Sequence, residues 1–108
     1  MTALNRTHQA VPAEKLVGPV IRGMDAELAE AIAEAVTADN PDREVHVADY
    51  GGYIRIHTAW ECRLTRASLE QALGYPFPLS RLEPALSGFA GRMTLADDET
   101  IWYLERRD

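Results

Sequence analysis

The sequence predicts an α+β fold: one compact domain in which antiparallel hairpins are packed with about three helices. Three observations indicate this fold class. Apolar and polar residues alternate in several short segments, as they do in half-buried strands. Two other segments carry apolar residues three or four positions apart, as helices do. A length of 108 residues leaves room for a single hydrophobic core.

The first predicted element is a short strand that follows an N-terminal tail. Residues 1–14 lack apolar periodicity and contain Pro12, so we expect a mobile tail there and a folded domain over residues 15–108. The run Leu16–Ile21 is rich in branched apolar residues, which favours a strand. Pro19 has no backbone N–H to donate, so this strand is either at a sheet edge or bulged.

The next segment is predicted to be a helix with Asp25 as its N-cap and an end at Asp39-Asn40-Pro41. Its apolar positions share one face, which we expect to pack inward: Leu28, Ile32, Ala35 and Val36. Its acidic positions form a stripe on another face: Glu27, Glu30 and Glu34. Such a stripe is either a solvated face or a contact surface for a basic groove.

A hairpin and a third strand are predicted to follow. Val45 and Val47 alternate with polar residues, as do Ile54 and Ile56, and Tyr50-Gly51-Gly52 lies between them as a turn. The run Trp60, Cys62 and Leu64 alternates in the same way and is expected to extend this meander. Cys62 then faces the apolar side, which predicts a buried and unreactive thiol.

The C-terminal part is predicted to contain two helices and a second hairpin. Thr65 is a suitable N-cap for a helix that Gly74 closes. A third helix over Leu79–Leu86 is expected to be short or kinked, because Pro84 lies inside it. The last hairpin pairs a strand over Phe89–Leu95 with a strand over Glu99–Leu104.

Composition excludes several classes of protein. The net charge is −6 and the arginines are scattered singly, so we expect no nucleic-acid partner. No apolar run approaches the ~20 residues that span a bilayer, so we expect no membrane insertion. The single cysteine excludes an intrachain disulfide, and no secretory leader is recognisable, so we expect a cytoplasmic protein.

The residue patterns of common catalytic sites are missing. The three histidines, His8, His46 and His57, have none of the spacings that hold a metal, and the two in the hairpin are expected on outward positions. The serines lie outside any nucleophile elbow, and no phosphate-binding loop occurs. We therefore expect a protein without cofactor or catalytic centre.

Six segments form a combination that points to one family. They are Val17-Gly18-Pro19-Val20-Ile21-Arg22; Asp39-Asn40-Pro41; Val45-His46-Val47-Ala48-Asp49 with Tyr53-Ile54-Arg55-Ile56; Leu64-Thr65-Arg66 with Leu69-Glu70; Leu73-Gly74-Tyr75-Pro76-Phe77; and Leu82-Glu83 with Leu86-Ser87-Gly88-Phe89-Ala90-Gly91. From about Val17 to Leu104, the chain resembles the effector proteins of soluble bacterial di-iron monooxygenases. This family includes component B of methane monooxygenase and the effector of phenol hydroxylase, and the toluene 4-monooxygenase and alkene monooxygenase branch is the most similar.

The resemblance implies a non-catalytic effector domain in which helices pack against a pair of sheets. It implies no prosthetic group, a monomer when free, and reversible binding to a large hydroxylase that carries the two irons. In the family, the effector alters the metal site and the substrate channel. It also promotes the coupling of O₂ and electron use to hydroxylation.

The resemblance also implies which residues touch the hydroxylase. Ser87, Gly88 and Phe89 match the segment of component B that faces the substrate passage, and the predicted hairpin tip matches a family motif. Aromatic residues and arginines dominate interface energetics, which favours Tyr53 and several arginines as anchors. The candidate hydroxylase interface comprises Arg22, Tyr50, Gly51, Gly52, Tyr53, Arg66, Ser87, Gly88, Phe89 and Arg92.

Three alternatives stay open at this point. Phe89 lies in one alternating run with Met93 and Leu95, so it is either an interface anchor or a core residue. A sheet-and-helix domain of this size is also typical of small-ligand-sensing regulatory domains, because fold alone does not fix function. A stand-alone enzyme would have to rest on Cys62 or the histidines.

Overall fold

The computed structural model describes residues 12–105 of the chain. The predicted mobile tail therefore lies mostly outside the described residues, and its last part forms a 3-10 turn at Ala13–Lys15. In chain order, the strands and α-helices are β1 (Leu16–Arg22), α1 (Ala26–Asp39), β2 (His46–Asp49), β3 (Tyr53–Ala59), β4 (Glu61–Thr65), α2 (Arg66–Leu73), β5 (Leu86–Ala90), β6 (Arg92–Leu95) and β7 (Glu99–Tyr103). The α+β fold class is confirmed.

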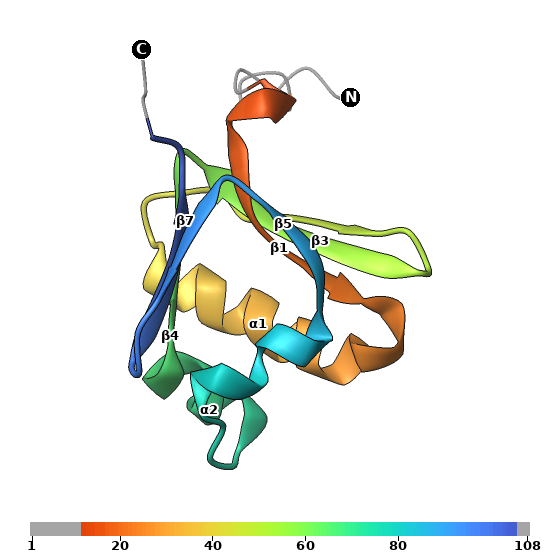
Figure 1. Ribbon diagram of the computed structural model, residues 1–108, viewed down its shortest axis with the longest axis vertical. Coiled ribbons are helices and arrows are strands. Elements are labelled where there is room, and N and C mark those ends of the chain that lie inside the picture. Colours follow the sequence, from red (N-terminus) through yellow and green to blue (C-terminus); the bar gives the residue numbers. More distant parts are fainter. Residues whose placement is uncertain (1–11, 106–108) are drawn as a thin grey trace.

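Two antiparallel sheets share one core. The first has the strand order β2-β3-β1-β5 and the second the order β4-β7-β6. Figure 1 shows α1 between the first sheet and α2, with the second sheet along one side. Both sheets and both helices contribute fully buried side chains to the core: Ile21, Ile32, Leu64, Leu69 and Trp102. Because neither sheet has a core of its own, the described residues form one packing unit.

Strand β1 lies inside the first sheet, between β3 and β5. The prediction of an edge strand is therefore wrong, whereas the alternative of a bulged strand is confirmed. The pairing with β5 shifts its register between Val20 and Ile21. This irregularity lies next to Pro19, whose missing N–H interrupts a regular ladder.

Helix α1 ends in a network that joins it to two other elements. Asp39 accepts hydrogen bonds from the Thr65 backbone N–H (2.7 Å) and from the Ser68 hydroxyl (2.7 Å). The Asn40 amide donates to the Arg63 carbonyl (2.8 Å) and accepts from the Arg63 N–H (3.0 Å). Asp39 and Asn40 thus end the helix, as predicted, and also hold it against β4 and the start of α2.

The rest of α1 agrees with its sequence pattern. Ile32, Ala35 and Val36 are buried and Leu28 is partly buried, and the three glutamates of the acidic stripe are exposed. Asp25 occupies the N-cap position, but its side chain makes no capping hydrogen bond. A preceding 3-10 turn at Gly23–Asp25 leads the chain into the helix.

The β2–β3 hairpin is confirmed, but the third strand does not extend it. Trp60 has a φ of 72°, a left-handed conformation that is rare outside glycine. At this residue the chain leaves the first sheet, so β4 begins the second sheet instead of continuing the meander. Cys62 on β4 is fully buried, as predicted, and burial raises the pKa of its thiol to about 11.

One prediction for the C-terminal part is confirmed and one is wrong. The third helix is present as two short 3-10 helices, Leu79–Arg81 and Glu83–Ala85, and it is short and interrupted as expected because Pro84 cannot continue an α-helical ladder. The single strand over Phe89–Leu95 is split at Gly91, where a φ of 92° turns the chain from the first sheet into the second. The β6–β7 hairpin itself is confirmed.

Candidate functional site

Within residues 12–105, no helix packs on one face of the first sheet, and α1 lies on the other face (Figure 1). Directly opposed residues in antiparallel strands point to the same face. Val17, Ile21 and Ile56 point to the core, so their sequence neighbours point away from it. We call the outward side the open face. Its residues form two cross-strand rows: Ala48, Arg55, Val20 and Gly88; and His46, His57, Gly18 and Ala90.

The tip of the β2–β3 hairpin forms an aromatic cluster at one end of the open face. The Tyr50 N–H donates to the Tyr53 carbonyl (2.9 Å), and Gly51 adopts a φ of 85° in the turn between them. The two tyrosine rings lie 5.0 Å apart, and the Arg55 guanidinium lies 5.6 Å from the Tyr50 ring centroid. Both tyrosines remain exposed, at 56% and 38%. Rings preordered in this way bury large contact area at a small entropic cost.

Arg22 joins this cluster from the end of β1. It pairs with Tyr53 in the sheet register, and its guanidinium donates to the Pro84 carbonyl (3.0 Å) and to the Met24 sulfur (3.4 Å). The next residue, Gly23, donates its N–H to the Gly52 carbonyl (2.9 Å). A side chain at Gly23 would collide with the hairpin backbone, so this close approach requires glycine. The structure therefore brings together five of the ten predicted interface residues: Arg22, Tyr50, Gly51, Gly52 and Tyr53.

The β5 candidates border the open face from its other side. Gly88 opposes Val20 on the open face, and an added Cβ there would meet no atom within 4 Å. Phe89 opposes Pro19 and so points to the opposite side of the sheet, at its edge. It is 46% exposed, so the core alternative for Phe89 is wrong. Ser87 is exposed beside them.

The two remaining candidates lie in other parts of the fold. Arg66 begins α2, where its Nε donates to Glu70 (2.8 Å). Arg92 begins β6 and forms an ion pair with Glu105 (2.9 Å). Neither belongs to the hairpin cluster, and their role at an interface stays a prediction.

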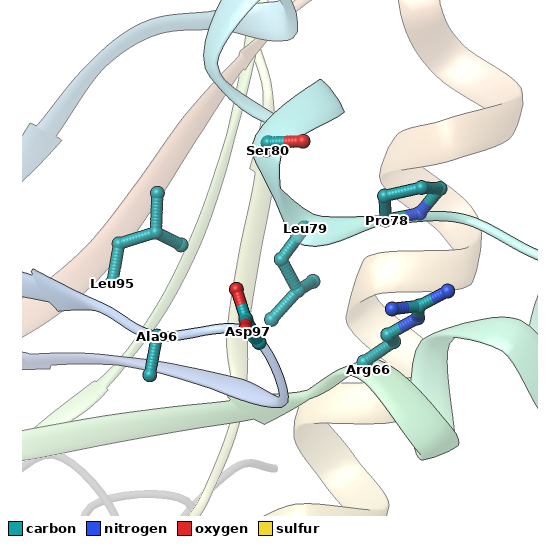
Figure 2. A pocket seen from close by; sticks show the side chains of 7 residues that line it. All are labelled: Arg66, Pro78, Leu79, Ser80, Leu95, Ala96 and Asp97. Carbon is teal, nitrogen blue, oxygen red and sulfur yellow. The ribbon is translucent and has the colours of Figure 1, made fainter.

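Arg66 also lines a shallow hollow that bears on the ligand-sensing alternative. Figure 2 shows it with Ser80 and Asp97 around an opening between the start of α2, a 3-10 turn and the β6–β7 turn. Its volume is about 190 Å³. Small-molecule sites usually enclose about 300–1,000 Å³. This hollow is therefore small for a metabolite, and its one arginine is already paired with Glu70, whereas two other hollows of about 310 and 320 Å³ only reach the lower end of that range.

His57 is the one open-face residue with an unexpected environment. It was predicted on an outward position, yet it is 6% exposed, and no group between residues 12 and 105 forms a hydrogen bond with its Nε2 atom. Its ring lies against Gly18, and His46 opposes it on β2. The pKa of His57 falls to about 4, mainly because burial disfavours the charged ring and also because Arg55 is near. Among residues 12–105, no group of three metal-binding side chains includes it.

Sequence reasoning missed Arg55, Val20 and Ala48 as members of the open face. The alternation in the hairpin could have placed Arg55 on the same side as Tyr53. The register of β1 against β3 and β5 could not be read in this way.

No helix among the described residues is long and apolar enough to cross a membrane.

Comparison with known proteins agrees with this architecture. A model of the MmoB/DmpM family matches residues 15–103. The alkene monooxygenase system effector subunit of Xanthobacter autotrophicus (strain ATCC BAA-1158 / Py2) is 58% identical over 90 residues, which are 83% of this chain and 87% of that protein.

Two solved structures share the fold. A chain of a phenol hydroxylase–regulatory protein complex is 28% identical, with a TM-score of 0.66 over 83% of this chain and 99% of that chain. The soluble methane monooxygenase regulatory protein B is 21% identical, with a TM-score of 0.61 over 97% of this chain and 74% of that chain, a likeness of fold alone. Since the family model covers most of the sequence, this chain belongs to the MmoB/DmpM family.

Proposed function

We propose that this protein is the non-catalytic effector subunit of a multicomponent aromatic or alkene monooxygenase. The observation that carries the proposal is the 58% identity to an alkene monooxygenase effector subunit. At this identity, and over most of both chains, the same role in an oxygenase complex is the simplest inference. The protein would act in the cytoplasm, as a monomer when free, and would hold no cofactor of its own.

The partner in this proposal is the hydroxylase component, which carries the di-iron centre. The similarity to a chain of a phenol hydroxylase–regulatory protein complex supports such a partner. The open face and the hairpin cluster offer a suitable contact surface, because exposed tyrosines lie next to Arg22 and Arg55 there. Tyrosine and arginine are enriched at the centres of protein interfaces.

An effector without a reactive group can act only through differential binding. It shifts the hydroxylase toward the conformation that it binds more tightly, and by no more than the difference between the two affinities. In this way the protein would adjust the active site, the access of substrate and the coupling of O₂ and electron use to hydroxylation. Gly88 and Ala90 carry no large side chain on the β5 side of the open face, which would let a helix of the hydroxylase approach closely.

The proposal is tested by reconstitution. The protein is titrated into its cognate hydroxylase and reductase, and product formed, electrons consumed and peroxide released are measured together. We expect saturable binding and a rise in product per electron. The double variant Tyr50→Ser with Tyr53→Ser should lose most of this effect while keeping its fold. No binding, or no change in product per electron at saturation, would contradict the proposal.

A further inference from the structure

A groove runs beside Arg22, outside the residues that the sequence singled out. Two adjoining hollows, of about 320 and 260 Å³, share four of their lining residues: Met24, Asp25, Leu28 and Phe77. They therefore form one continuous depression. Its walls are the start of α1 on one side and the segment that follows α2 on the other.

The groove exposes apolar side chains that the core does not use. Met24 is 78% exposed and Tyr75 is 54% exposed, whereas Phe77 lies beneath them at 8%. Leu28 is half-buried in the same groove. Large apolar side chains grouped around a depression are typical of a binding surface, and methionine adapts its shape to a partner.

The two ends of the groove carry opposite charges. Arg22 and Arg81 lie at one end, where the Arg81 guanidinium is 5.8 Å from the Phe77 ring centroid. Glu27 lies at the other end, and Asp25 borders both hollows. A segment that fits the groove therefore needs an apolar centre, an acidic side chain near the arginines and a basic one near Glu27.

The groove is continuous with the surface already described. Arg22 belongs to both, since it pairs with Tyr53 in the sheet and lines the groove beside Met24. The hydrogen bond between Gly23 and Gly52 fixes the groove relative to the hairpin tip. A partner that covers the hairpin cluster would thus reach Met24 without a gap.

The backbone around the groove determines which kind of segment fits. Only one strand residue lines it, Arg22 at the end of β1, and Arg22 is already paired with Tyr53 of β3, so no run of free strand edge is available to an extended peptide. A helix satisfies its own backbone hydrogen bonds and presents side chains at i, i+3, i+4 and i+7. The groove is therefore suited to a helix and not to an added strand.

We propose that this groove binds an amphipathic helix of the hydroxylase, with Met24 and Tyr75 as apolar anchors and the two charged ends setting its direction. This inference rests on the proposed function and adds to it a second contact region beside the hairpin cluster. The helix would carry an aliphatic row, with an acidic residue toward Arg22 and a basic one toward Glu27.

The apolar anchors are tested with a matched pair of variants of the full chain. Met24→Ser removes an anchor, and Leu95→Ser removes a 45% exposed leucine on β6, in the other sheet. We expect Met24→Ser to raise the Kd for the intact hydroxylase about tenfold, as loss of an interface anchor does, and Leu95→Ser to change it less than about twofold. Thermal unfolding of each variant checks that the fold is kept.

The charge pattern is tested with a second pair on one helix. Glu27→Lys and Glu34→Lys change the net charge of the protein equally, but only Glu27 lines the groove. We expect Glu27→Lys to weaken binding several-fold more than Glu34→Lys, with a difference that shrinks as salt increases. Equal effects of the two substitutions would overturn the assigned direction of the helix.

Crosslinking identifies the occupant directly. Because Cys62 is buried, a photocrosslinker on a Met24→Cys variant would label that position selectively. Crosslinks to an amphipathic helix of the hydroxylase support the proposal, and crosslinks to a strand, a loop or a second copy of this chain overturn it. Equal affinities of Met24→Ser and Leu95→Ser also overturn it. Either of these two results would leave the proposed function intact. Failure of the wild-type protein to bind the hydroxylase would contradict both the proposed function and the proposed groove.

Discussion

Burial changes the acid–base behaviour of two side chains, His57 and Cys62. The pKa of His57 is lowered to about 4 because burial disfavours the imidazolium, with Arg55 and His46 adding to the effect and the backbone near Gly18 opposing it. The pKa of Cys62 is raised to about 11 because burial disfavours the thiolate. Near neutral pH both groups are therefore uncharged: the His57 imidazole is a weak base, and Cys62 is a thiol and not the nucleophilic thiolate.

The His57 environment predicts a pH dependence of stability. Since the folded-state pKa lies below the unfolded value of 6.5, the unfolded chain binds more protons between these two values. Stability should therefore fall as pH decreases from 6.5 toward 4, by about 2 kcal/mol at pH 5. Urea unfolding at pH 7.5 and 5 measures this loss. The His57→Gln variant should lose less between these pH values, whereas His46→Gln, which removes only a smaller cause of the His57 shift, should keep most of the wild-type loss.

Gly88 provides a residue-level prediction about function. An added side chain has room there, so Gly88→Val should fold normally and place a branched group on the open face. We expect lower product per electron, or a changed product distribution, with a change in unfolding free energy under about 1 kcal/mol. Thr94→Val, on an exposed position of β6, is the control. Unchanged coupling, unchanged products and unchanged peroxide release for Gly88→Val would contradict the prediction.

At the scale of elements, the connections between helices and strands depend on a few polar groups. Asp39 holds the end of α1 against the first turn of α2, and Asn40 holds it against β4. Thr65 accepts a hydrogen bond from the Ser68 N–H, which completes the cap of α2. These interactions join three elements at a single point.

Removing the Asp39 carboxylate from this hydrogen-bond network should destabilise the protein. Asp39→Ala leaves the Thr65 N–H and two hydroxyl groups without their acceptor, which we expect to cost about 2–3 kcal/mol of unfolding free energy. Asp42→Ala, three residues later on an exposed position, should change it by less than about 0.5 kcal/mol. Urea unfolding of the two variants at neutral pH makes the comparison. Equal unfolding free energies of the two variants would show that the hydrogen bonds of Asp39 do not stabilise the protein.

Elements with strong local signals could be predicted from the sequence, and those that depend on distant contacts could not. Helix α1, helix α2 with its Thr65 cap and Gly74 end, and both hairpin turns follow from periodicity and turn chemistry. The φ of Trp60 and the break at Gly91 depend on how the two sheets meet. Local alternation describes each strand but does not say to which sheet it belongs.

In the candidate site too, features set by local sequence could be predicted and features set by distant contacts could not. Five of its predicted residues are neighbours because they lie in one hairpin or beside it in the sheet. Phe89 was ambiguous because its side depends on the β1–β5 register, and Met24 and Tyr75 had no sequence signal beyond being apolar in turns. His57 is buried although its strand position points outward, because glycine at position 18 leaves room for the ring.

At the scale of the whole molecule, two sheets and two helices surround one core. Trp102 of the second sheet and Ile21 of the first are both fully buried in it. With 108 residues and a shared core, the protein is expected to unfold without a stable intermediate.

Cooperative unfolding is tested by two signals from different regions. Tryptophan fluorescence reports mainly on the second sheet and its border, where Trp102 and Trp60 lie, and far-UV circular dichroism reports on all elements. We expect one urea transition with the same midpoint for both signals and an m value of about 1–3 kcal/mol per molar. Separate midpoints would show that the two sheets unfold independently.

The central position of β1 has a consequence for biosynthesis. This strand leaves the ribosome before any other described strand, yet its second partner, β5, lies near the end of the chain, where Ala90 pairs with Gly18. Until translation is almost complete, the nascent chain can therefore pair β1 only with β3, and the edge of β1 that later pairs with β5 stays open. Such distant pairing also slows closure of the sheet. We expect newly made chains to depend on holdase chaperones more than a helical bundle of equal length does.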